Sequence, residues 1–146
     1  MANWYGTARS NYVRLKDPGA VRQLLAARAA EIELQESASQ PGLFVFLVGG
    51  LSDSGGWPTV ARLSASGEPD PEVDGEDFLD VMAEHLADGE VLITIEAGAE
   101  KLRYITGWAQ AVRMHRGRVQ RLQLSIADIY RLVQRRWKVT PTEALY

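Results

Sequence analysis

The stretch EVLITIEAGAEKLRYITGWAQAVRMHRGRVQRLQL, residues 90–124, decides the fold of this chain. Three runs rich in β-branched, aromatic and other apolar residues follow one another in this region: residues 90–97, 102–114 and 119–125. Gly98 lies between the first two runs, and the turn sequence HRGR separates the last two. Such runs, joined by short turns, predict three consecutive antiparallel strands.

Helix and strand patterns alternate in the rest of the chain. Asp17 is a typical residue to cap a helix that begins directly after it. In the same way we expect Asp74 to cap a helix over residues 75–87, and Ser125 with Asp128 to open a last helix. Four further stretches are predicted as strands: residues 10–16, 31–37, 41–50 and 57–63.

The predicted order of elements is therefore β-α-β-β-β-α-β-β-β-α. We expect residues 1–146 to form a single α+β domain, a mostly antiparallel sheet of about five to six strands with three helices packed on one face. The length of 146 residues, with 46% hydrophobic and 24% charged residues, is typical of one globular domain with its own core.

The composition disfavours several chemistries. The chain has no cysteine, which excludes disulfides, thiolate metal sites and cysteine nucleophiles. Its two histidines, His85 and His115, lie in different predicted elements without a metal-ligand spacing, and no nucleophile-elbow motif is present. We therefore expect no catalytic residue, no metal and no cofactor, and a cytoplasmic protein without a signal peptide or membrane span.

The net charge of −3 conceals a separation of charges along the chain. Residues 68–90 hold ten acidic residues and no lysine or arginine, whereas residues 101–138 hold ten lysines and arginines and one acid. Either the two regions pair their charges within the fold, or they form opposed surfaces that attract partners. The acidic candidates are Asp74, Glu76, Asp77, Asp80 and Glu84. The basic candidates are Arg113, His115, Arg116, Arg118, Arg131 and Arg135.

Two smaller features carry further hypotheses. Trp57 directly follows two glycines, and it is either an anchor for a partner or a lid over the core. A polar pocket would arise if the N-terminal strand pairs beside the hairpin around Gly98; its members would be Arg9, Tyr12, Glu96 and Arg103. If these side chains are buried, a shifted pKa would allow acid–base chemistry. If they lie on an exposed hairpin, they form only a solvated network of charges.

Several stretches resemble a group of small proteins of bacterial plasmids and related mobile elements. They are NWYGTARSNYVRLKD at residues 3–17, GGWP at 55–58, HLADGEVLITIEAGAEKLRYITGWAQAV at 85–112 and LSIADIY at 124–130. The resemblance implies no catalytic residue. It implies a setting, because small accessory proteins of mobile elements commonly block host defences such as CRISPR or restriction complexes by binding to them.

The leading interpretation is a non-enzymatic accessory protein that binds and inhibits a host nucleic-acid-targeting defence complex. Either the acidic stretch occupies a site meant for DNA, or the basic face engages an acidic subunit surface. One alternative is a nucleic-acid-binding module that uses the basic face over residues 113–138. The other is a small enzyme with the polar pocket near Arg9, Glu96 and Arg103.

Overall fold

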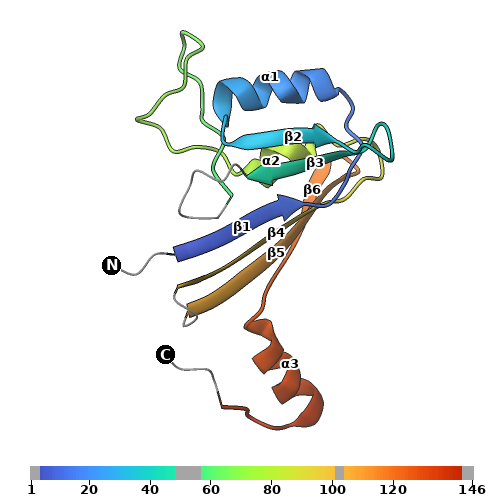
Figure 1. Ribbon diagram of the computed structural model, residues 1–146, viewed down its shortest axis with the longest axis vertical. Helices are drawn as coiled ribbons and strands as arrows, with labels where there is room; N and C mark the ends of the chain where they lie inside the picture. The colour runs from blue at the N-terminus through green and yellow to red at the C-terminus, as the bar shows by residue number, and fades with distance from the viewer. Residues whose placement is uncertain (1–3, 49–56, 101–103, 143–146) are drawn as a thin grey trace.

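The structure is a computed structural model that describes residues 4–48, 57–100 and 104–142 (Figure 1). Strands and helices follow one another along the chain in the order β1 (Trp4–Ser10), α1 (Pro18–Arg28), β2 (Ile32–Glu36), β3 (Phe44–Val48), α2 (Phe78–Ala83), β4 (Leu92–Glu100), β5 (Tyr104–His115), β6 (Arg118–Ser125) and α3 (Asp128–Trp137).

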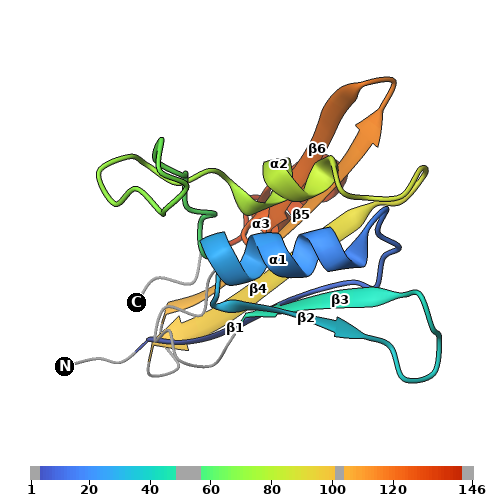
Figure 2. The same ribbon diagram turned by 90° about the horizontal axis from the view of Figure 1, so that it is seen from above.

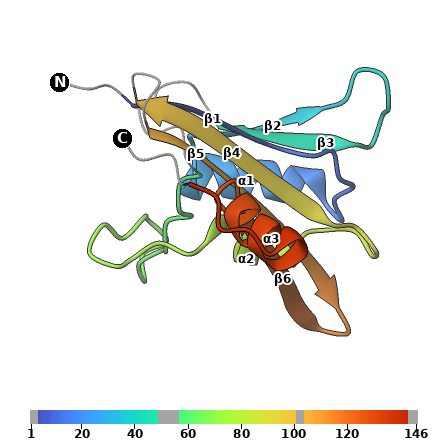
Figure 3. The same cartoon turned by 90° about the horizontal axis from the view of Figure 1, so that it is seen from below.

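The strands of the described residues form one six-stranded antiparallel sheet in the order β2-β3-β1-β4-β5-β6. Helices α1 and α2 lie on the same face, which we call the inner face (Figure 2). Helix α3 lies on the opposite side, beyond the end of β6 (Figure 3). The α+β class and the antiparallel sheet of six strands are confirmed, and β4, β5 and β6 are the predicted meander. The expectation that all three helices share one face is wrong, because α3 leaves the sheet on the other side.

The core lies between the inner face and the two helices. Phe46, Met82 and Leu92 are fully buried there. The ring of Phe78 meets Phe46 edge-on, with centroids 5.2 Å apart, and stacks on Trp57 at 4.9 Å. Because α2 begins at Phe78, this aromatic stack fixes the start of the helix on the sheet.

Helix α1 begins where the sequence predicts. The carboxylate of Asp17 accepts a hydrogen bond from the backbone N–H of Ala20 at 3.0 Å, as an N-cap does. Val21 and Leu25, one turn apart, are buried against the sheet. The capping residue and the apolar spacing therefore agree on one helix with one buried face.

The predicted helix over residues 75–87 is shorter than expected, and Asp77 rather than Asp74 caps it. Glu76 exchanges two backbone hydrogen bonds of 2.8 Å with Val60, so the chain before Asp77 is extended. After α2, the carbonyl of His85 accepts a hydrogen bond from the backbone N–H of Lys16 at 2.9 Å. Contacts with distant segments thus limit the helix at both ends.

Two predicted strands are also corrected. In place of a strand over residues 57–63, the structure has isolated bridges that involve Val60 and Leu63. Proline at position 58 lacks the N–H that a continuous ladder needs. In place of a strand over residues 10–16, β1 ends at Ser10. The next residue, Asn11, bonds to Ile93 through its backbone N–H and to Val91 and Ile93 through its side chain.

The hairpin between β4 and β5 is longer than predicted. The sequence suggests a turn around Gly98, but β4 continues to Glu100, and Gly98 pairs with Thr106 inside the ladder. Small residues on both sides of Gly98 are compatible with a continuous extended strand. Glu96 is therefore a mid-strand residue rather than the end of a strand.

Candidate functional site

The segment of residues 64–75, which we call the acidic loop, projects from the domain beside α1 (Figure 2). The side chains of Glu68, Glu72 and Asp74 are exposed, and the loop contains no lysine or arginine. Its base is ordered by backbone hydrogen bonds of 2.8 Å, from Ser64 to Glu68 and from Asp70 to Arg62. The loop thus holds a group of carboxylates together in water, where they create a negative potential.

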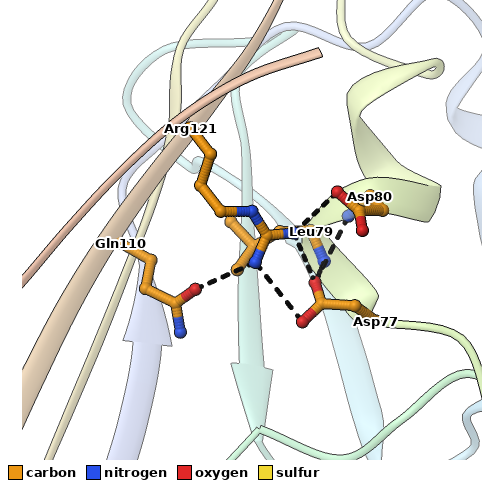
Figure 4. Close-up of polar contacts among 5 residues, drawn as sticks. All are labelled: Asp77, Leu79, Asp80, Gln110 and Arg121. Carbon is orange, nitrogen blue, oxygen red and sulfur yellow. Dashed lines mark hydrogen bonds and ion pairs between the residues drawn. The ribbon is translucent and has the colours of Figure 1, made fainter.

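Arg121 ties the acidic and basic regions of the chain together (Figure 4). Its Nη2 atom donates to Oδ1 of Asp77 at 3.0 Å and to Oδ1 of Asp80 at 2.6 Å. Its Nη1 atom donates to Oε1 of Gln110 at 3.1 Å. Asp77 also caps α2, accepting a hydrogen bond from the N–H of Leu79 at 2.9 Å. These two aspartates therefore hold α2 on β5 and β6, which is the internal pairing of charges that the sequence left open.

The Arg121 cluster shifts the pKa of Asp77. Partial burial raises this pKa, but the hydrogen bond and positive charge of Arg121, together with the N–H groups of Asp80 and Leu79, outweigh burial. The pKa of the Asp77 carboxyl therefore lies below its usual value of 3.8. The same hydrogen bond raises the pKa of Arg121. The folded state thus favours the ionised pair.

The pair should make stability depend on pH in a defined direction. Because folding lowers the pKa of Asp77, the ion pair stabilises fully above the unfolded pKa of about 3.9 and loses its effect as pH falls through the folded value. Arg121→Gln should cost up to about 1 kcal/mol of unfolding free energy at neutral pH, since both partners are partly exposed.

Urea denaturation at a series of pH values tests this expectation. The difference between the wild type and Arg121→Gln should be constant well above the unfolded pKa of about 3.9 and should shrink as pH falls through the lower pKa of folded Asp77. Arg118→Gln is the matched control, because Arg118 is exposed at the β5–β6 turn. A difference that persists unchanged in acid would contradict the role of Asp77.

The acidic candidates do not form one free surface. The carboxylate of Glu76 forms an ion pair with Arg28 of α1. Asp74 belongs to the acidic loop, and the side chain of Glu84 is exposed at the end of α2. Three of the five acidic candidates therefore form ion pairs within the fold: Glu76, Asp77 and Asp80. The other two, Asp74 and Glu84, are exposed. The acidic loop and Glu84 remain exposed to a partner, and the loop holds the larger group of carboxylates.

The basic candidates fall into two groups at opposite ends of β6. His115, Arg116 and Arg118 are exposed at the β5–β6 turn, where Arg116 and the next glycine have positive φ angles. Arg113, on the adjoining strand, donates to the side chain of Gln120 at 2.8 Å. The eight residues of β6 span roughly 24 Å, so this turn lies far from α3.

The second basic group lies on α3. Arg131 forms an ion pair with Asp128 one turn earlier, and Arg135 is exposed. The carboxylate of Asp128 also accepts a hydrogen bond from the backbone N–H of Ser125 at 2.6 Å, which fixes the start of the helix. A continuous basic face over residues 113–138 is therefore not formed.

The proposed polar pocket is not assembled by β1 and β4. Arg9 pairs with Ile95, whereas Ala8 pairs with Glu96, so the side chains of Arg9 and Glu96 point to opposite faces of the sheet. Tyr12 is 44% exposed beyond the end of β1. Arg103 lies outside the described residues. The register thus separates the groups that an acid–base site would need together.

Trp57 covers part of the core. Its ring stacks on Phe78, and its backbone N–H donates to Oε2 of Glu96 at 3.2 Å. Its indole Nε1 is buried and has no hydrogen-bond partner within the described part of the chain. Of the two interpretations of this residue, these contacts favour the lid over the anchor.

An apolar surface on the outer face of the sheet was not anticipated. Because Arg121 and Val112 face the helices, the residues next to them in β5 and β6 face outward. Two cross-strand rows form the outer apolar face: Ile93, Ala111 and Leu122, and Ile95, Ala109 and Leu124. The alternation of Leu122 and Leu124 with glutamine in β6 is the sequence signal that predicts such a one-sided strand.

No protein-family model, no curated protein and no solved structure matches this chain in the three comparisons. No cluster of three or more histidine, aspartate or glutamate side chains suitable for a metal ion occurs among residues 4–48, 57–100 and 104–142. Within the same residues, the helices are too short or too polar to cross a bilayer.

Proposed function

We propose that this protein acts by binding another protein, and that the acidic loop is its contact with a host nucleic-acid-targeting complex. The observation that carries the proposal is the exposed group of Glu68, Glu72 and Asp74 on a projecting loop without basic residues. A cleft that binds DNA or RNA is lined by lysine and arginine, which also attract carboxylates. The resemblance to proteins of mobile elements supports a defence complex as the target.

The mechanism of inhibition is competition for the nucleic-acid site. The acidic loop presents several carboxylates on a backbone that hydrogen bonds already order, so little conformational entropy is lost on binding. The internal pairing of Asp77 and Asp80 with Arg121 keeps these two residues out of the contact. Binding should be fast and should weaken as the salt concentration rises, because the attraction is between exposed charges.

Removing the charges of the acidic loop should weaken target binding about tenfold, a loss of about 1.4 kcal/mol. The test variant is Glu68→Gln/Glu72→Gln/Asp74→Asn. The matched control, Glu31→Gln/Glu33→Gln/Asp88→Asn, removes the same number of exposed carboxylates elsewhere. The protein is immobilised and incubated with lysate of a host that carries CRISPR and restriction systems, and captured nuclease or surveillance subunits are identified and their affinity measured.

Capture should fall with the loop variant, persist with the control and decrease when excess duplex DNA is added as a competitor. Failure to capture any nuclease or surveillance subunit would reject the proposed target. Equal capture by both variants would reject the acidic loop as the contact.

A second candidate function, direct nucleic-acid binding, rests on the exposed arginines of the β5–β6 turn. Arg116 and Arg118 lie there with no acidic residue in the turn itself. A DNA-binding protein would be retained on duplex DNA with an affinity that falls steeply with salt. Retention of the purified protein on duplex DNA over a range of salt concentrations separates the two functions, since only a nucleic-acid-binding protein would be retained in the absence of any host protein.

A further inference from the structure

Helix α3 is amphipathic but has no buried residue. Its apolar side chains Ile129, Leu132 and Trp137 are each about half or more exposed, with Trp137 at 70%. An isolated helix of ten residues is marginal in water, because most helical stability in proteins comes from packing of the apolar face. Among residues 4–48, 57–100 and 104–142, nothing buries Ile129, Leu132 and Trp137 as the apolar face of such a helix is normally buried.

The outer apolar face has small side chains along its middle strand and larger ones on the two strands beside it. Ala109 and Ala111 of β5 form a shallow trough, which the larger side chains of β4 and β6 flank on either side. Leu122 at the rim is 76% exposed. At the α3 end of β6 the trough continues into an open groove of about 730 Å³, lined in part by Leu124 and Ile129. A ridge of apolar helix side chains would fill this trough and groove.

The connection between β6 and α3 directs the helix away from its own sheet. The backbone N–H of Ile126 donates to the carbonyl of Gly107 at 3.0 Å, which extends the strand pairing by one residue. Asp128, two residues later, is bonded to the N–H of Ser125. A Cβ at Gly107 would lie 3.1 Å from the side chain of Ile126, so this corner is tightly packed. These contacts fix the end of β6 on β5, and α3 begins directly after them.

We propose that the protein forms a two-fold dimer in which α3 of each copy lies on the outer apolar face of the other. Each copy has both surfaces, α3 and the outer apolar face. In a two-fold dimer the contact between them therefore occurs twice. Six apolar side chains on the two surfaces are each about half or more exposed: Ile95, Leu122 and Leu124 on the sheet, and Ile129, Leu132 and Trp137 on α3. Burying both sets in each copy approaches the roughly 800 Å² per partner of a standard protein interface. This association uses a surface distinct from the acidic loop.

The test is the molar mass in solution, measured by light scattering and sedimentation over a wide range of concentrations. The wild type should have twice the chain mass of 16.2 kDa. Leu124→Glu and Ile129→Glu should each raise the dissociation constant about 100-fold or more, because a two-fold interface contains each substitution twice. Val73→Glu, at an exposed apolar residue of the acidic loop, is the matched control and should remain dimeric.

A disulfide crosslinking experiment identifies which copy supplies the helix. Because the chain has no native cysteine, only the introduced cysteines can form the disulfide. The double variant Ala109→Cys/Ile129→Cys, oxidised at high dilution, should migrate as two linked chains on a non-reducing gel. A single chain with an internal disulfide would show α3 folded onto its own sheet and would overturn the proposal. A monomeric wild type, or a dimer that tolerates both glutamates, would overturn it as well. The charge-neutral loop variant should stay dimeric, so a failed dimer and a failed target contact give different results.

Discussion

Replacing Phe78 with alanine should lower the free energy of unfolding by about 4 kcal/mol, which is close to a thousandfold in the unfolding constant. Phe78 is 2% exposed and lies between the rings of Phe46 and Trp57. The substitution removes the ring, leaves a cavity and ends both aromatic contacts. Because Phe78 is also the first residue of α2, the loss loosens the helix on the sheet.

Urea denaturation followed by far-UV circular dichroism measures this effect. Leu63→Ala is the control, since Leu63 is 46% exposed in the chain before the acidic loop and should change stability by no more than about 0.5 kcal/mol. A loss below about 1.5 kcal/mol for Phe78→Ala would mean that the aromatic stack is not a principal part of the core.

Local signals in the sequence predict the elements that depend on local interactions. The cap of α1 by Asp17 and the buried spacing of Val21 and Leu25 are examples, because both act within one helix. The meander of β4, β5 and β6 is another, since its strands are consecutive and short turns connect them. In these regions the capping, the periodicity and the turn chemistry all favour the same structure.

The sequence fails where distant segments compete with local preference. Asp74 and Asp77 are equally good helix caps by composition, but the pairing of Glu76 with Val60 selects the second. β1 ends earlier than predicted, at Ser10, and beyond it the side chain of Asn11 adds bonds to Val91 and Ile93 beside its own backbone bond to Ile93. Neither long-range partner is visible from a window of neighbouring residues.

The candidate sites show the same difference between features set by local sequence and features set by long-range contacts. Charge separation in the sequence predicts an acidic region over residues 68–90 but does not say which of its carboxylates stay exposed. It cannot predict that Arg121 pairs with Asp77 and Asp80, because that pairing requires the start of α2 to lie beside Arg121 of β6. The outer apolar face becomes recognisable only with the register, which aligns the alternating residues of β4, β5 and β6 into rows.

Asn11→Ala should cost about 2 kcal/mol of unfolding free energy. The Nδ2 group of Asn11 donates to the carbonyl of Val91 at 3.0 Å, and its Oδ1 accepts from the N–H of Ile93 at 2.8 Å. Alanine would leave a backbone donor and a backbone acceptor without these partners, at a part-buried position. Since β1 pairs with both β3 and β4, the loss acts at the centre of the sheet.

Denaturant midpoints and amide hydrogen exchange test this role together. Gln120→Ala is the control, because Gln120 makes an exposed side-chain hydrogen bond to Arg113, and its loss should change stability by about 0.5 kcal/mol or less. In Asn11→Ala the amide of Ile93 should exchange faster than the amides in the middle of the β4–β5 ladder, because the lost bond is local. Uniform exchange together with unchanged stability would show that the backbone bond from Asn11 to Ile93, at 3.0 Å, suffices to hold the strands together.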